Sequence, residues 1–308
     1  MNKESYLEEK YIKTKNKVRK ITTYRDGENA LRKRHEDIAA LLEEKCMPSV
    51  FAKAYAKNSS IVKNARAHMY NDIFLFFDVK NFFPSLNHNY LAKQLYRELK
   101  KKGDVSLNSC HKLVRLCSVN KKGLPLGLVT SPVLSNIYMK EFDNILYGKL
   151  KKLGLENVIY TRYADDIVIS YKSGEDSFEG AERIKELVYE RLRKIGLKSN
   201  EKKEKVRSIR RGGHVRITGV TITRDDDNYR KLSVGRKKKD GLYRDAVQYV
   251  QGEETDRQKA LKIKGYEAFV LAVEGRSYEE CFSENMMQVV KEMGYASLHD
   301  LIKEIKTC

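Results

Sequence analysis

The sequence lacks any hydrophobic run long enough to span a membrane, and its first residues contain no apolar signal core. The longest apolar run, residues 73–77, has the length of a strand and ends in the charge of Asp78, whereas a membrane helix needs about 20 apolar residues. The five cysteines are an odd number, are scattered, and include no close metal-binding pair. We therefore expect a protein of the reducing cytoplasm with no membrane partner.

Proline is scarce, and the chain has neither an internal repeat nor a low-complexity tract. Only four prolines occur, all in the first half of the 308 residues. Hydrophobic residues make up 41% and aromatic residues 9% of the chain, so there is enough apolar material for a core and general disorder is excluded. This length predicts one large globular unit or two to three subdomains that share a core.

Acidic residues are too few to balance the basic ones. The 61 Lys and Arg against 42 Asp and Glu give a net charge of +19. Residues 198–248 hold about 16 basic and about 7 acidic residues, and Tyr229 and Tyr243 lie among them. Cations pair with phosphates and rings stack on bases, so this pattern favours a nucleic-acid groove, with a generally basic solvated surface as the alternative.

The hydrophobic pattern predicts a mixture of helices and strands. Helices are expected at the basic N-terminus, around 38–42, and over 89–101, 131–152, 178–195 and most of 241–308. Strands are expected over 18–24, 73–79, around 217–219 and 232–234, and as a hairpin over 158–170; residues 122–127 are expected to form a loop.

Three aspartates form the most informative group. Asp78 ends a strongly apolar strand, and Asp165 and Asp166 lie between two apolar runs, at the tip of the expected hairpin. Carboxylates held there would be partly desolvated and would repel one another, which is costly without a cation. Two Mg²⁺ ions about 3.5–4 Å apart would neutralise them, activate an attacking hydroxyl and stabilise a leaving pyrophosphate. An ordinary acidic turn is the alternative for the pair alone.

The sequence around these aspartates resembles that of reverse transcriptases. Residues 163–166 (YADD) match the metal-binding tetrapeptide, and residues 77–83 (FDVKNFF) resemble the strand that supplies the other catalytic aspartate. Residues 123–136 resemble the nucleotide-pocket motif, residues 200–203 (NEKK) the downstream lysine motif, and residues 17–21 (KVRKI) the fingers motif. The five motifs occur in the family's order.

This resemblance implies an α+β right-hand polymerase. Fingers would span about 1–76, the palm with a fingers insertion and an antiparallel sheet 77–225, and a helical thumb 226–308. It implies RNA-directed DNA synthesis from dNTPs with two Mg²⁺ ions, by in-line attack of a sugar hydroxyl on the α-phosphate. No RNase H-like domain is expected to fit in the remaining length.

Two short signatures resemble bacterial retron reverse transcriptases. Residues 64–68 (NARAH) match the NAxxH signature, and residues 216–220 (RITGV) resemble the VTG motif with Ile217 in place of Val. This resemblance implies a cognate structured noncoding RNA that serves as template and primer. DNA would start at an RNA 2′-hydroxyl, and the branched RNA–DNA product would serve phage defence with a separate effector protein. The alternatives are another bacterial defence-type reverse transcriptase without a retron RNA, and a non-catalytic RNA-binding scaffold.

The resemblance also implies roles around the nucleotide. Asp78 and Asp165 would be metal ligands, and Asp166 either a ligand or a supporting residue. Arg19 would contact the triphosphate, because a guanidinium donates to two phosphate oxygens at once. Phe83, five residues after Asp78, would exclude a ribose 2′-hydroxyl; core packing is its alternative role.

The remaining nucleotide contacts concern a lysine and a loop. Lys203 would neutralise or protonate the leaving pyrophosphate, with Lys202 as a substitute. Leu126 departs from the usual LPQG motif, which affects expected fidelity more than activity. Gly127 still permits close backbone approach.

Nucleic-acid contacts are expected outside this pocket. Asn64 and His68 are expected to have a structural or RNA-contact role, and Thr218 and Gly219 to turn a hairpin that supports the primer end. The residues expected to contact phosphates or RNA bases are Arg236, Lys237, Lys238, Lys239 and Tyr243.

Overall fold

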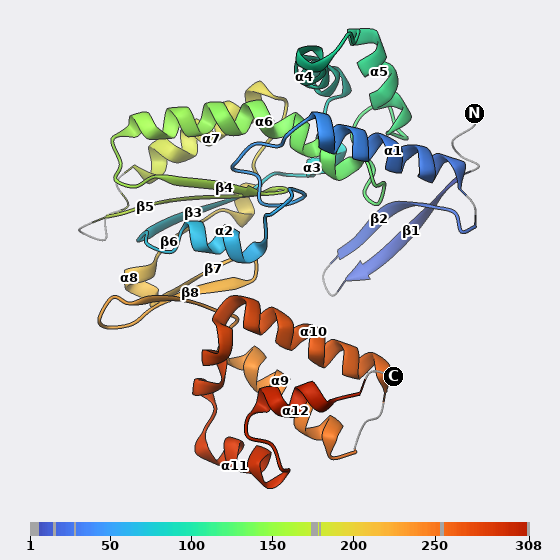
Figure 1. Cartoon of the computed structure of the whole chain (residues 1–308). Coiled ribbons are helices and arrows are strands. Elements are labelled where there is room, and N and C mark those ends of the chain that lie inside the picture. Colours follow the sequence, from blue (N-terminus) through green and yellow to red (C-terminus); the bar gives the residue numbers. More distant parts are fainter. Residues whose placement is uncertain are drawn as a thin grey trace. The chain divides into compact units, whose positions relative to one another are not determined.

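The computed structural model describes residues 6–14, 17–27, 29–173, 178, 180–252 and 256–306. The chain divides into two compact units, one formed by Met1–Ser60 with Asn71–Arg207 and the other by Ile61–Tyr70 with Ser208–Cys308. Figure 1 shows both units as mixtures of helices and strands, which confirms the expected α+β class. Of the five cysteines, Cys308 lies outside the described part of the chain.

The first unit contains a four-stranded sheet with the order β4-β5-β3-β6. Its strands are β3 (Ile73–Asp78), β4 (Ile159–Tyr163), β5 (Asp166–Tyr171) and β6 (Lys205–Ser208). Strand β5 pairs antiparallel with both β4 and β3. The expected strand and hairpin are therefore confirmed, as their β-branched and aromatic residues predict.

Helices cover this sheet and share its hydrophobic core. Figure 1 shows α6 and α7 along one face of the sheet. The helices and short 3₁₀ turns of this part are α3 (Phe82–Ser85), α4 (His88–Leu99), η2 (Lys100–Lys102), α5 (Leu107–Leu116), α6 (Ser131–Leu150), η3 (Lys151–Leu153) and α7 (Ala181–Lys194). Helix α7 buries Ile184, Val188 and Leu192 at intervals of four residues, which is the expected amphipathic pattern.

The N-terminal segment is a β-hairpin, so the helix expected there is wrong. Strand β1 (Leu7–Thr14) pairs antiparallel with β2 (Lys17–Tyr24), and α1 (Ala30–Lys45) follows. Leu7 and Tyr24 are buried in one cluster with Leu31 of α1, and Lys20 pairs with Glu9 across the hairpin at 2.5 Å. These cross-strand contacts outweigh the local helix preference of a basic segment.

The second unit is built on a three-stranded antiparallel sheet, β7-β8-β9, against which a short helix packs. Its elements are α2 (Ile61–Ala67), α8 (Ile209–Gly212), β7 (His214–Ile217), β8 (Val220–Arg224) and β9 (Arg230–Ser233). Helix α2 comes from a distant part of the sequence and contacts β7 and β8. The predicted turn is confirmed, because Thr218 and Gly219 join β7 to β8 with φ angles of 45° and 92°.

The rest of the second unit is helical, as expected. It comprises α9 (Arg236–Val250), α10 (Arg257–Glu274), η5 (Gly275–Cys281), α11 (Glu284–Glu292) and α12 (Leu298–Glu304). Helix α9 begins earlier than the expected start at 241, so the basic residues 236–239 form its first turn. Among the described residues, no helix has both the length and the apolar composition to cross a bilayer.

Candidate functional site

The three aspartates converge where β3 and the β4–β5 hairpin end. Asp78, the last residue of β3, lies directly opposite Asp166, the first residue of β5. Asp165 lies in the two-residue turn between β4 and β5, and its carbonyl accepts a hydrogen bond from the backbone N–H of Val79 at 3.0 Å. The other turn residue, Ala164, has φ of 57°, an uncommon conformation for a residue with a side chain. The backbone therefore fixes the hairpin tip against the end of β3.

A fourth segment reaches the same corner. The 3₁₀ turn η4 (Glu201–Lys203) follows Asn200, whose backbone N–H donates to the carbonyl of Asp78 at 2.7 Å. The Asn200 side-chain amide also donates to Asp78 Oδ1, at 3.2 Å. Lys203 Nζ contacts Asp78 Oδ2 at 2.5 Å. The structure thus brings Lys203 to the carboxylates, which favours it over Lys202 for the expected lysine role.

The carboxylates carry more negative charge than their neighbours neutralise. Burial and the nearby charge of Asp78 raise the pKa of Asp165, against the opposing effect of Lys203 and Arg19. Lost hydration and repulsion from Asp165 and Asp78 raise the pKa of Asp166 to about 6, although its side chain keeps solvent contact. Both carboxyl groups are therefore harder to ionise than a free aspartate unless a cation is added.

The donor set fits a hard divalent cation, which prefers carboxylate oxygens. Across the described segments, no three His, Cys, Asp or Glu side chains already form a metal-binding group. One oxygen of Asp78 is held by Lys203 instead. Asp78, Asp165 and Asp166 are the residues that would hold the ion.

Strand β2 and the loop before α6 approach each other closely at Gly127. The backbone N–H of Thr22 donates to the carbonyl of Leu126 at 2.8 Å. Gly127 has φ of 107°, and a Cβ there would lie 2.4 Å from the carbonyl oxygen of Thr22. Glycine is required at this position both by conformation and by space. The close approach ties the loop to the strand that carries Arg19, while the side chain of Leu126 packs on the core.

Phe83 lies at the edge of the core. It is 9% exposed, and its ring contacts the ring of Phe82, which is 3% exposed, at a centroid distance of 5.2 Å. Its other aromatic neighbour is Tyr55, at 6.5 Å, which is 51% exposed. Both phenylalanines belong to the hydrophobic core, with Phe82 deeper and Phe83 beside an exposed ring.

Sequence reasoning did not single out Tyr55. This residue has φ of 55°, which is an outlier for an aromatic side chain. Burial raises the pKa of the Tyr55 phenol, and the charge of Asp165 adds to this effect. The local sequence contains no signal for this placement, because the conformation of Tyr55 is held by a distant residue.

That residue is Asn136, part of a buried polar network that the sequence also did not reveal. The Asn136 amide donates to the carbonyls of Ala54 and Tyr55, at 3.0 and 3.1 Å. Its oxygen accepts from Arg162, which also donates to the carbonyl of Ala164 at 3.1 Å. Asp143 receives two bonds from the Arg162 guanidinium, each 2.9 Å. Arg162 therefore supports the hairpin tip and Tyr55 together.

The two short signatures meet in the second unit. Asn64 on α2 and His68 just after it are both fully buried. The Asn64 side-chain amide donates to Thr218 Oγ1 at 3.1 Å, although 154 residues separate them. Of the two roles expected for Asn64 and His68, the structure supports the structural one.

The basic cluster on α9 is more divided than its sequence suggests. Lys239 is 7% exposed and its ammonium pairs with Glu274 at 2.8 Å. Tyr243 is 9% exposed, packs on Phe282, and donates its hydroxyl hydrogen bond to the carbonyl of Met286. This corrects the expectation for Lys239 and Tyr243, because helical periodicity turns these two positions into the core.

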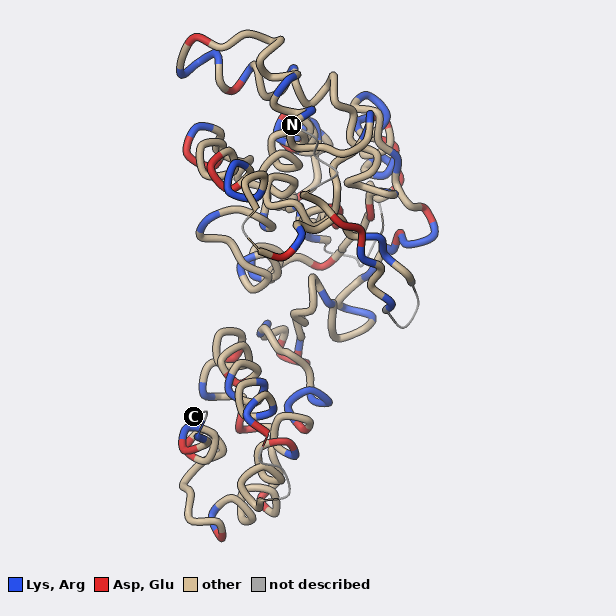
Figure 2. The backbone as a smooth tube through the Cα atoms, turned by 90° about the vertical axis from the view of Figure 1, so that its right-hand side faces the viewer, with Lys and Arg blue, Asp and Glu red and all other residues tan. Residues whose placement is uncertain are grey.

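The other members of the cluster face outward. Arg236 and Lys237 are exposed and Lys238 is half-buried, and Arg236 pairs with Asp240 one turn further along α9. Figure 2 shows Lys and Arg spread along the backbone of both units, with acidic residues fewer. Basic residues therefore occur along both units and are not confined to this cluster.

Comparison with known proteins gives a family match over most of the chain. The sequence profile described as "Reverse transcriptase (RNA-dependent DNA polymerase)" matches residues 3–249. The Retron Ec73 reverse transcriptase of Escherichia coli is 30% identical over 201 residues, which are 60% of this chain and 62% of that protein. The Retron Ec86 reverse transcriptase of E. coli is 27% identical over 235 residues, 76% of this chain and 66% of that protein. The chain thus spans slightly less than two thirds of these relatives.

Solved structures agree on the fold. The apo telomerase of Candida tropicalis superposes with a TM-score of 0.53 and 11% identity, over 96% of this chain and 62% of that one. A telomerase of Candida albicans superposes with a TM-score of 0.51 and 12% identity, over 97% of this chain and 64% of that one. Telomerase reverse transcriptases have the right-hand polymerase fold, so the expected fold class is confirmed.

Proposed function

The chain belongs to the reverse transcriptase family, and we propose that it is an RNA-directed DNA polymerase that acts on a cognate structured RNA. The observation that carries the proposal is the placement of Asp78, Asp165 and Asp166 at one corner of the sheet. Burial and repulsion from the neighbouring carboxylates raise the pKa of Asp165 and of Asp166. A non-catalytic scaffold would gain nothing from holding like charges together.

Reverse transcriptases use divalent metal ions, and we propose two Mg²⁺ ions at the three aspartates. The bound ions would lower the pKa of the attacking sugar hydroxyl and stabilise charge on the pyrophosphate. Asp78 and Asp165 are the proposed direct ligands, and Asp166, opposite Asp78, either a third ligand or a support. The hydrogen-bonded hairpin tip holds the backbone that carries Asp165 and Asp166 against the end of β3.

Three further residues are proposed to handle the dNTP. Arg19 binds the triphosphate, which agrees with its electrostatic effect on Asp165. Lys203 neutralises or protonates the leaving pyrophosphate once it has released Asp78. Phe83, at the edge of the core, excludes the ribose 2′-hydroxyl, and Gly127 keeps the nucleotide loop against β2.

We assign fingers to about 1–76, palm with a fingers insertion to 77–225, and thumb to 226–308. Segment Ile61–Tyr70, within the proposed fingers, packs in the same unit as the C-terminal residues. Thr218 and Gly219 support the primer end. Asn64, which donates to Thr218, and His68 have a structural or RNA-contact role beside this turn. Arg236, Lys237 and Lys238 contact phosphates of the nucleic acid.

The retron relatives support a more specific proposal. The cognate noncoding RNA is template and primer, and synthesis starts at one of its 2′-hydroxyls. The branched RNA–DNA product serves phage defence in the cytoplasm, with a separate effector protein.

The polymerase activity is tested by primer extension with purified protein, an RNA template, a DNA primer, dNTPs and MgCl₂. The double variant Asp165→Asn/Asp166→Asn should lose at least about a thousandfold in rate, because the site can no longer bind its cations. Asp226→Asn/Asp227→Asn removes two exposed turn carboxylates and is the matched control. Equal extension by wild type and the site variant would refute the catalytic proposal.

The retron proposal is tested on nucleic acid that co-purifies with the protein expressed from its native locus. A discrete DNA whose mobility changes with both DNase and RNase, and which the double variant lacks, supports self-primed synthesis. DNA without attached RNA would favour a defence-type enzyme without a retron RNA. RNA alone, identical in wild type and variant, would leave a binding protein.

A further inference from the structure

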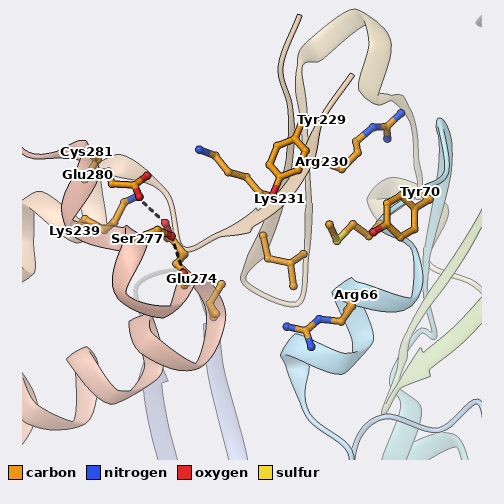
Figure 3. Close-up of a pocket in the computed structure, with 13 residues that line it drawn as sticks. Arg66, Tyr70, Tyr229, Arg230, Lys231, Lys239, Glu274, Ser277, Glu280 and Cys281 are labelled. Carbon is orange, nitrogen blue, oxygen red and sulfur yellow. Dashed lines mark hydrogen bonds and ion pairs between the residues drawn. The ribbon is translucent and has the colours of Figure 1, made fainter. Parts of the chain in front are cut away.

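The second unit contains a pocket of about 620 Å³ for which the proposals above provide no role (Figure 3). One wall comes from the end of α2 and the residues after it, a second from the start of β9, and a third from α9, α10 and η5. The volume falls within the range of about 300–1,000 Å³ that is usual for small-ligand sites. The pocket is therefore large enough for a nucleotide.

Two tyrosines are the most exposed rings of this pocket. Tyr70 is 67% exposed and Tyr229 is 65% exposed, and both line the pocket. Large rings left in solvent beside a pocket are typical of a binding surface. A tyrosine ring offers a flat face on which a nucleobase can stack.

Cations lie beside these rings. Arg66 and Lys231 are exposed, and neither forms an ion pair within the described ranges of the chain. In Figure 3 both side chains extend into the space between α2, β9 and the helices. These two charges are free to meet phosphate, whereas the ammonium of Lys239 is already held by Glu274.

The remaining polar groups favour RNA over DNA. Ser277 and the exposed Glu280 line the pocket near its helical wall. A ribose 2′-hydroxyl can donate a hydrogen bond to these oxygens, whereas deoxyribose has no hydroxyl at this position. A base within a duplex is already stacked on its neighbours, so only an unpaired base can enter.

We propose that this pocket binds an unpaired nucleotide of a single-stranded RNA segment. The base stacks on Tyr70 and Tyr229, and the flanking phosphates contact Arg66 and Lys231. The inference rests on the proposed function in supplying an RNA ligand, and it adds a recognition site separate from the aspartate corner.

The test uses the full chain and a fluorescein-labelled ten-residue oligouridylate, measured by fluorescence anisotropy. Tyr70→Ala/Tyr229→Ala should weaken binding at least about fivefold, since base–aromatic stacking is lost. Tyr70→Phe/Tyr229→Phe keeps both rings and should bind nearly as wild type. Tyr11→Ala removes an equally exposed ring (66%) outside the pocket and is the matched control.

The charges are tested by salt dependence. Arg66→Gln and Lys231→Gln should each reduce the slope of log affinity against log salt by about 0.7, the value for one phosphate contact on a single strand. A 4-thiouridine in the oligonucleotide should cross-link to a peptide that contains Tyr70 or Tyr229. A cross-link elsewhere, or unchanged slopes, would overturn the proposal.

Two comparisons of ligands distinguish an unpaired RNA nucleotide from DNA and from duplex RNA. Equal affinity for the oligothymidylate DNA of the same length would overturn the assignment to RNA, and equal affinity for duplex RNA would overturn the unpaired nucleotide. Primer extension by the wild type tests the proposed function independently. If extension occurs while the tyrosine variant binds RNA as wild type does, the pocket proposal fails alone.

Discussion

In the first unit, the negative charge of three aspartates is only partly neutralised. In the second unit, each buried carboxylate whose contacts the structure describes has hydrogen-bond donors around it. Three aspartates share the corner at the end of β3, and only Lys203 forms an ion pair with them in the described residues. In the second unit, Glu274 accepts from Lys239, Ser233 and the backbone of Val234.

This difference distinguishes carboxylates that stabilise the fold from carboxylates that can bind a cation. A buried carboxylate with a full set of donors stabilises the fold and has no capacity left for a ligand. A carboxylate whose neighbours are carboxylates is costly to the fold and gains from an added cation. The same rule operates inside the first unit, because the buried Asp143 is fully engaged by Arg162 and Tyr160.

The largest effect is expected from breaking the Asp143–Arg162 pair. Arg162→Met leaves a buried carboxylate without its cation and removes the donor to the carbonyl of Ala164. We expect a loss of about 3–5 kcal/mol in the free energy of unfolding, measured by urea denaturation with circular dichroism. The control Lys172→Met removes an exposed partner of Glu156 and should change stability by less than about 0.5 kcal/mol.

Breaking the buried ion pair between Lys239 and Glu274 in the second unit should reduce the free energy of unfolding by less. Lys239→Met leaves Glu274 with two other donors, so we expect about 2 kcal/mol. Hydrogen exchange by mass spectrometry should show faster exchange in β9 and at the end of α10. Lys237→Met, on the exposed side of the same helix, is the matched control. A loss as large as that of Arg162→Met would mean that Glu274 depends on Lys239 alone.

Two glycines with positive φ allow the effect of backbone strain to be separated from the effect of a steric clash. Gly219 (φ 92°) has nothing within 4 Å of a Cβ, whereas a Cβ at Gly127 would meet the carbonyl of Thr22. Gly219→Ala should therefore cost about 1 kcal/mol, from backbone strain alone. Gly127→Ala should cost more and raise the KM for dNTPs several-fold, because it displaces the strand that carries Arg19. If the two variants lost equal stability and the KM for dNTPs did not change, then β2 would be able to move away from residue 127 without affecting stability or dNTP binding.

The local signals in the sequence predicted the group of three aspartates better than the residues that support it. Asp78, Asp165 and Asp166 follow apolar runs whose strand character is local, so their meeting at a sheet edge could be expected. The supports provided by Tyr55 and Arg162 could not, because the side-chain partners of these residues, Asp143 and Asn136, lie 19 to 81 residues away and only the tertiary structure brings them together. The N-terminal hairpin was missed for the same reason, since cross-strand contacts decide its conformation.

The smallest expected effect concerns Lys203, which holds the oxygen of Asp78 that a cation would need. Lys203→Met frees this oxygen and removes an ammonium that offsets repulsion among the aspartates. The variant should gain more stability from Mg²⁺ than the wild type does, by about 2 °C in Tm at 10 mM MgCl₂, while its extension rate falls. Differential scanning fluorimetry with ionic strength matched by NaCl measures the shift, and Lys202→Met is the control. An equal Mg²⁺ response in all three proteins would mean that the ammonium and the cation do not compete for Asp78.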